Sequence, residues 1–201
     1  KVQQSKPKKR APFSTSILEI NKLLKACVAI SAAFGIVLAG SLFSAGFIVM
    51  LVISAFTVGI AFLAHEISHK LVAQHYGCFA EFRSFDQMLI LAVIMSFFGF
   101  VFAAPGAVMI SGPVGRRRNG IISAAGPSMN LILGSLFFVG YILMPSVVFF
   151  YGYLINTILA LFNMIPIWNF DGKKILAWSK AYYALMAVVG VALILGQTIA
   201  G

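Results

Sequence analysis

The feature that most restricts how this chain can fold is an uncharged stretch that runs from Ala26 to Ala64. Its 39 residues are about twice the roughly 20 residues that one helix needs to cross the apolar core of a bilayer. We therefore expect two membrane-spanning helices, joined by a tight turn between Gly40 and Gly46. The whole chain is 61% hydrophobic and 10% charged, whereas soluble domains are about 25% charged. Its five acidic residues are too few for a water-covered surface, which excludes a soluble globular protein.

The basic residues are clustered at the ends of apolar segments. Seven of the fifteen Lys and Arg residues lie within residues 1–25, and three more form Arg116–Arg118. This distribution is typical of cytoplasmic flanks in membrane proteins and does not indicate binding to nucleic acid. We expect a multi-pass protein of the cell membrane with a cytoplasmic N-terminus. The two cysteines, Cys27 and Cys78, are expected to be free thiols.

The expected fold is an all-α polytopic membrane protein with a short β element on the cytoplasmic side. The pattern predicts about five or six transmembrane or re-entrant helices. Residues 1–13 form a basic tail that is expected to be disordered, and residues 14–201 form a single membrane domain. This domain begins with an interfacial amphipathic helix at 14–26. The predicted spans are 27–43, 47–76, 121–144, 147–165 and 181–200.

The apolar residues 88–104 allow two interpretations. A full crossing would place Arg116–Arg118 on the outer side, against the preference of basic residues for the cytoplasm. A re-entrant segment keeps these arginines inside and is the favoured interpretation. Residues 107–111 are expected to form a strand, so that 88–111 is a re-entrant and β element.

The second predicted span contains the sequence His65-Glu66-Ile67-Ser68-His69, an HExxH pattern. Histidines four residues apart lie on one face of a helix, where two neutral imidazoles can ligate zinc. The Glu between them is then placed to deprotonate a zinc-bound water. Unpaired, these side chains would be costly in an apolar helix. We predict His65 and His69 as ligands and Glu66 as the base; a hydrogen-bonded polar cluster or a proton relay is the alternative.

Two further residues of this helix require interpretation. His75 repeats the HExxHxxGxxH spacing, but Val72 stands where that pattern needs a glycine to break the helix. In a continuous helix His75 is turned about 240° from His69, so we expect it to cap the helix end at the membrane interface. Lys70 lies at i+4 from Glu66, where the two could pair. We expect Lys70 instead to extend its ammonium group to the interface.

The third metal ligand must come from another part of the chain. The remaining acidic residues are Glu19, Glu81, Asp86 and Asp171. Glu19 is expected on the surface helix, and the next two in a solvated loop. Asp171 follows a spanning helix that Pro166 ends. Gly172 allows an unusual backbone at this turn, so that Asp171 can be directed back toward a metal. A simple N-cap for the following helix is the alternative.

Three motifs together resemble the site-2 protease family of intramembrane zinc metallopeptidases. They are HExxH at His65–His69, GPxxN at Gly126–Asn130, and NxxPxxxxDG at Asn163–Gly172. The resemblance implies that 14–201 is an intramembrane metalloprotease domain. It also implies one zinc ion per chain, held by His65, His69 and Asp171, with Glu66 as general base. Asn130 would line the site and contact the substrate or the developing oxyanion; on the residues alone, it is a buried amide that can join two helices.

The sequence departs from the resembled family in the longer, more apolar segment 88–104 and in the turn before Asp171. Trp168 stands where many members have Pro, which is expected to leave the Asp171 loop less rigid.

The predicted function is an intramembrane zinc endopeptidase that cleaves transmembrane segments of other membrane proteins, in regulated intramembrane proteolysis. The expected partners are therefore a transmembrane protein substrate and the lipid bilayer, with the active site open to the cytoplasmic side. The strand at 107–111 offers an edge for an extended substrate.

Two alternatives to this function remain. The first is a membrane-anchored HExxH peptidase that acts outside the lipid and takes its third metal ligand from a Glu in a later helix. It is opposed because the sequence has no Glu after Glu81 and no soluble domain. A non-enzymatic metal transporter or channel would have more polar spans.

Overall fold

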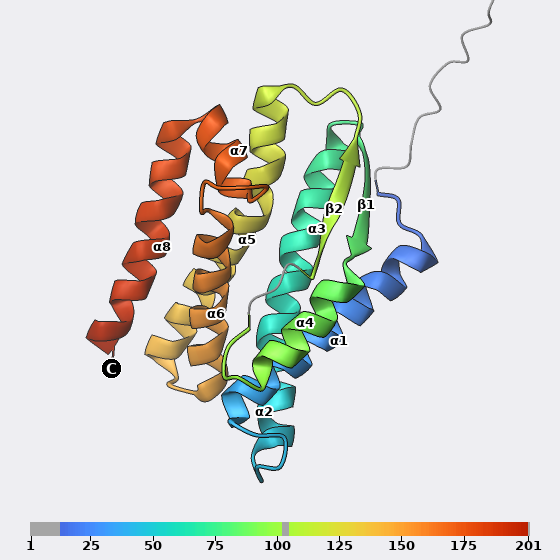
Figure 1. Cartoon of the computed structure of the whole chain (residues 1–201). Coiled ribbons are helices and arrows are strands. Elements are labelled where there is room, and N and C mark those ends of the chain that lie inside the picture. Colours follow the sequence, from blue (N-terminus) through green and yellow to red (C-terminus); the bar gives the residue numbers. More distant parts are fainter. Residues whose placement is uncertain (1–12, 102–104, 201) are drawn as a thin grey trace, which may run out of the picture.

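The computed structural model describes residues 13–101 and 105–200, with side chains as far as residue 196. The predicted disordered tail lies, apart from Phe13, outside these residues. Figure 1 shows a bundle of long helices with a two-stranded sheet along one side. The elements are α1 (Ile17–Ala39), α2 (Phe47–Ser54), the π-helical turn η1 (Ala55–Gly59), α3 (Ile60–His75), β1 (Phe79–Ser84), α4 (Asp86–Ser96), β2 (Gly106–Ser111), α5 (Arg116–Leu143), α6 (Val147–Asn163), α7 (Asp171–Trp178) and α8 (Lys180–Ala200).

Three of these helices are long and apolar enough to cross a membrane. They are Ile17–Ala39, Phe47–His75 and Arg116–Leu143. The second combines α2, η1 and α3 into one 29-residue helix, which is roughly 44 Å long and exceeds the roughly 30 Å apolar core of a bilayer. Shorter apolar helices cover 147–163 and 180–196. The chain is therefore a multi-pass membrane protein with a mostly helical fold.

The N-terminal helix is longer than the sequence pattern predicts. The interfacial helix expected at 14–26 and the span expected at 27–43 form one continuous helix, α1. Ser16 caps its start, because the Ser16 hydroxyl accepts a hydrogen bond from the Glu19 N–H at 3.1 Å. Gly40 ends it in the left-handed conformation with φ 72°. Residues 17–34 contain no Gly or Pro, so the amphipathic first part of the helix continues directly into its apolar second part.

The segment between the two strands leaves the sheet and returns to the same end of it. β1 and β2 are antiparallel, and Ser84 pairs with Gly106. The helix between them, α4, has 11 residues, or about 16 Å, which is too short to cross a bilayer. The re-entrant interpretation of 88–111 stays a prediction, and residues 102–104 lie outside the described part. The Phe62 and Phe82 rings, 5.7 Å apart and edge-on, hold the sheet against α3.

The helix α5 lies at the centre of the bundle and packs against α3, α6 and α7 (Figure 1). An apolar core joins it to the C-terminal half, with buried side chains from α5 to α8 that include Leu131, Ala160, Ile175 and Met186. Elements on both sides of α5 can therefore contribute to one buried site. Cys27 and Cys78 are free, as predicted.

Candidate metal centre

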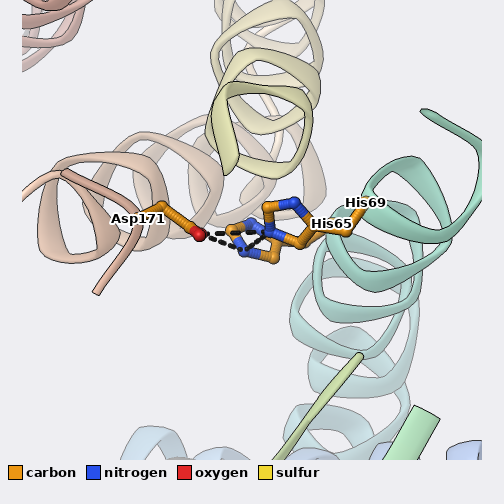
Figure 2. Close-up of side chains that lie close together, drawn as sticks. All are labelled: His65, His69 and Asp171. Atoms are coloured by element: carbon orange, nitrogen blue, oxygen red, sulfur yellow. Dashed lines mark hydrogen bonds and ion pairs between the residues drawn. The ribbon is translucent and has the colours of Figure 1, made fainter. Parts of the chain in front are cut away.

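His65, His69 and Asp171 form a single buried group between α3 and α7, as Figure 2 shows. The two imidazole Nε2 atoms lie 3.0 Å apart. Asp171 Oδ2 lies 3.0 Å from His69 Nε2 and 3.5 Å from His65 Nε2. The three residues that the sequence analysis predicted as metal ligands thus direct their donor atoms toward one point.

The outer nitrogen of each imidazole already has a hydrogen-bond partner. His69 Nδ1 donates to the Ile122 carbonyl at 2.7 Å. His65 Nδ1 lies 2.5 Å from the Asn130 side-chain oxygen. A carbonyl oxygen can only accept, so each Nδ1 carries the proton and each Nε2 presents a lone pair. Metal-ligating histidines are typically oriented in this way.

The donor set fits zinc. Tetrahedral zinc takes nitrogen and oxygen ligands at about 2.0–2.1 Å, which places neighbouring donor atoms about 3.3 Å apart. The observed separations of 3.0–3.5 Å lie around this value. The two imidazoles and the one carboxylate also leave a position for water, as catalytic zinc sites do.

Asp171 reaches the histidines because of how α6 ends and α7 begins. The helix α6 stops at Asn163, before Pro166, and α7 starts at Asp171 itself. The N-cap residue of α7 is Phe170, without a side-chain capping bond. The Oδ2 atom of Asp171 faces the Nε2 atoms of both histidines, and the N-cap interpretation is wrong.

Two glycines permit the close packing around this group. A Cβ on Gly126 would collide with His69 Nε2 and lie 2.7 Å from His65 Nε2, so only glycine lets α5 pack directly against the imidazoles. A Cβ on Gly172 would collide with the Met164 backbone carbonyl. Glycine is therefore needed at position 172 because the Met164 backbone packs closely against it. The prediction that Gly172 provides an unusual backbone conformation is wrong, because its φ lies outside the left-handed region.

Asn130 lies directly behind His65, with no exposed surface. Its amide nitrogen donates to the Ala61 carbonyl at 3.0 Å and to the Asn156 side-chain oxygen at 2.9 Å. Contact of Asn130 with substrate or an oxyanion stays a prediction. Asn156 was missed in the sequence analysis, although a buried amide in an apolar span is the same signal that singled out Asn130.

Glu66 is buried next to the two imidazoles and is not paired with Lys70. The carboxylate lies within hydrogen-bonding reach of the Val108 N–H on β2. Lys70 instead pairs with Glu19 of α1 and is only 2% exposed. The expectations that Lys70 extends to the interface and that Glu19 lies on a surface helix are both wrong, because α1 and β1 cover this face of α3.

The remaining candidates lie away from the metal centre. His75 is at the end of α3, exposed, with its ring edge-on to Tyr76. Asp86 pairs with Lys25 at 2.6 Å on the surface. Glu81 is on β1, 3.9 Å from Arg83. None of these residues belongs to the His-His-Asp group in the described structure.

Two cavities of different character meet at Glu66. One, of about 180 Å³, is lined by His65, Glu66 and mainly apolar side chains of α1, η1, α3 and α6. The other, of about 120 Å³, is lined by Glu66, His69 and polar side chains that include Asn119, Ser123, Asn169, Asp171 and Lys174. Glu66 therefore stands between an apolar space and a polar one.

The fold and the site define a polytopic membrane protein with a candidate catalytic metal centre of the HExxH type. The chain is 40% identical over 148 residues to a protein of Methanocaldococcus jannaschii named "Putative zinc metalloprotease MJ0611", with 70% of this chain and 78% of that protein covered. The chain therefore belongs to the zinc metalloprotease family of the M. jannaschii protein, and zinc is the metal that both the family and the donor set indicate. No family model matches the chain, and no solved structure does.

Proposed function

We propose that this protein is an intramembrane zinc endopeptidase of the site-2 protease type. The observation that carries the proposal is the depth of the site. His65 contacts Asn130, which lies near the middle of the membrane-length helix α5, whose bounds are Arg116 and Leu143. A peptidase acting outside the lipid would have its metal centre beyond the ends of such helices. The likeness to a zinc metalloprotease supports the chemistry.

The proposed residue roles follow from the geometry. His65, His69 and Asp171 would hold the zinc ion, which when bound supplies a Lewis acid for peptide hydrolysis. Glu66 receives the proton of the attacking water and transfers it to the leaving amine. Its position at the border of the polar cavity gives that water a route to the carboxylate. Val108 of β2 lines the same cavity as the Glu66 carboxylate.

The substrate would be an unwound transmembrane segment. The edge of β2 away from β1 has no strand partner in the described residues, and residues Gly106–Met109 on β2 line a cavity of about 540 Å³ opposite Trp168, Asn169 and Phe170. An extended peptide can pair with such an edge through its backbone. The apolar cavity beside Glu66 is suited to side chains of a membrane segment.

A reporter protein with one transmembrane segment tests this function in liposomes. We expect the purified wild-type protein with zinc to cut within the apolar segment, at a position identified by mass spectrometry, and Glu66→Gln to leave the reporter intact. Cuts confined to residues outside the apolar segment would contradict intramembrane cleavage. Zinc uptake into sealed liposomes that is equal in wild type and Glu66→Gln, without any cleavage, would favour a transporter.

A further inference from the structure

A continuous chain of side-chain amides links the candidate metal ligand His65 to α6. His65 Nδ1 lies 2.5 Å from Asn130 Oδ1, and Asn130 Nδ2 donates to Asn156 Oδ1 at 2.9 Å. Asn156 Nδ2 in turn donates to the Gly152 carbonyl at 2.8 Å. Both asparagine side chains are fully buried, with 0% exposure. Bulk solvent therefore does not reach either amide.

The direction of every hydrogen bond in this chain is fixed from its far end. The Gly152 carbonyl can only accept, so Asn156 must turn its NH₂ toward it and its oxygen toward Asn130. The Asn156 oxygen and the Ala61 carbonyl both accept from the NH₂ of Asn130. The oxygen of Asn130 therefore faces His65, and only an Nδ1–H can meet it. The lone pair of His65 is left on Nε2, which faces Asp171 and His69.

We infer that Asn156 is a positioning residue of the metal centre, which holds the Asn130 amide in the orientation that keeps the His65 Nε2 lone pair directed at the metal. The inference rests on the proposed function only in that His65, His69 and Asp171 are taken to bind zinc. Asn156 touches neither the donor atoms nor the substrate cavities. It acts through Asn130, from a helix whose C-terminal turn also leads to Asp171.

A purely structural role for Asn156 predicts something different. A hydrogen bond between two membrane helices contributes only modestly to stability. Loss of such a bond would lower the stability of the bundle without changing how tightly a folded protein binds metal. Mutation of a residue that hydrogen-bonds the outer nitrogen of a metal-ligating histidine instead lowers metal affinity, typically by 10–100-fold. Metal affinity of the folded protein therefore separates the two roles, and it needs no proteolysis assay.

The experiment measures zinc affinity by competition with a chelator, in detergent, for the full chain and four variants. Asn156→Leu removes both hydrogen bonds, and Asn156→Thr has a hydroxyl that is too short to reach Asn130 but can bond to the Gly152 carbonyl. Asn156→Asp keeps an oxygen acceptor for Asn130 and, because a buried carboxyl is neutral, an O–H donor for the Gly152 carbonyl. The matched control is Thr157→Val, since Thr157 is equally buried on α6 and, among the described residues, its hydroxyl donates to the Tyr153 carbonyl and not to the asparagine chain.

We expect Asn156→Leu and Asn156→Thr to weaken zinc binding about 10-fold, the lower end of the range for outer partners. Asn156→Asp and Thr157→Val should stay within about 2-fold of wild type on the same scale. With Co²⁺ in place of zinc, the visible absorption spectrum should change in the Leu and Thr variants and not in the other two. If Asn156→Leu does not fold, zinc binding by Asn156→Thr decides between the two roles.

Wild-type affinity and an unchanged cobalt spectrum in the folded Leu or Thr variant would overturn the inference. So would an Asn156→Asp protein that loses zinc as strongly as the Leu variant does. Failure of the proposed function has a different signature, because the wild-type protein itself would then bind no zinc, or would retain it after His65→Ala.

Discussion

Lys70 and Glu19 form an ion pair that is closed off from solvent, with exposures of 2% and 1%. Lys70 directly follows the metal-site residue His69 on α3, and Glu19 is in the first turn of α1. The other oxygen of Glu19 accepts a hydrogen bond from the Phe82 N–H of β1 at 2.9 Å. A single carboxylate therefore joins α1, α3 and the sheet that reaches Glu66 through Val108.

Removal of either charge should destabilise the protein strongly. A buried charge left without its partner costs about 3–5 kcal/mol. We expect Glu19→Gln and Lys70→Met each to lower the thermal unfolding temperature in detergent by several degrees. The double variant Glu19→Leu/Lys70→Met should lose less than the sum of the single effects, because no unpaired charge remains. Additive losses would show that the pair is not energetically coupled, and Lys25→Met at the exposed Asp86 pair serves as the control.

Zinc content provides the direct check on the ligand set. A three-ligand catalytic site has no spare donor, so alanine at His65, His69 or Asp171 should each abolish stoichiometric zinc in the purified protein. His75→Ala should retain it, since His75 lies exposed at the end of α3. Metal analysis of the four folded variants decides the point. Zinc lost in His75→Ala but kept in Asp171→Ala would reverse the assignment.

Glu66→Gln should separate chemistry from binding. Gln keeps the shape of the side chain but cannot take up the proton of the attacking water. We expect reporter cleavage to fall by about 10²–10⁴-fold, the usual contribution of a general base, with zinc content at the wild-type level. Full cleavage by a zinc-loaded Glu66→Gln protein would exclude Glu66 as the base.

The HExxH group could be predicted from the sequence because its geometry is local. Helical periodicity alone places His65 and His69 on one face, and the pattern of uncharged residues places that helix in the membrane. The prediction of Asp171 as the third ligand needed information beyond helical periodicity, because its approach to the histidines depends on the turn after α6. The resemblance to a family supplied this step.

Helical periodicity could not predict the two buried polar networks, the Glu19–Lys70 ion pair and the Asn130–Asn156 hydrogen bond. Glu19 and Lys70 are 51 positions apart, and nothing local indicates that β1 covers them. Asn156 and Asn130 meet only because α5 and α6 pack side by side. Polar side chains in apolar helices are visible in a sequence, but their partners are chosen by helix packing. The continuity of α1 was missed for a related reason, since a change from amphipathic to apolar residues does not itself end a helix.

Gly126→Ala should eliminate the metal site while leaving the fold largely intact. The added methyl group would occupy the space of His69 Nε2 and press on His65, so at least one imidazole must leave its position. We expect loss of zinc and of cleavage together. Gly115→Ala, at the start of the same helix, adds a Cβ that would meet no described atom within 4 Å beyond its own chain neighbours, so it is the matched control and should bind zinc normally. Equal zinc content in both variants would mean that the imidazoles do not pack against α5 as described.

The last prediction concerns Trp168, which has a left-handed backbone with φ 45°. Its side chain is 75% exposed, so replacement removes little packing. Proline at this position would fix φ near −65° and restrict the preceding residue as well. Although many members of the resembled family have Pro here, we expect Trp168→Pro to rebuild the loop that leads to Asp171 and to lower zinc affinity. Trp168→Gly accepts a positive φ without strain and should bind zinc as the wild type does. Chelator competition on both variants checks this, and tighter zinc binding by Trp168→Pro than by wild type would show that the left-handed turn is not needed to place Asp171.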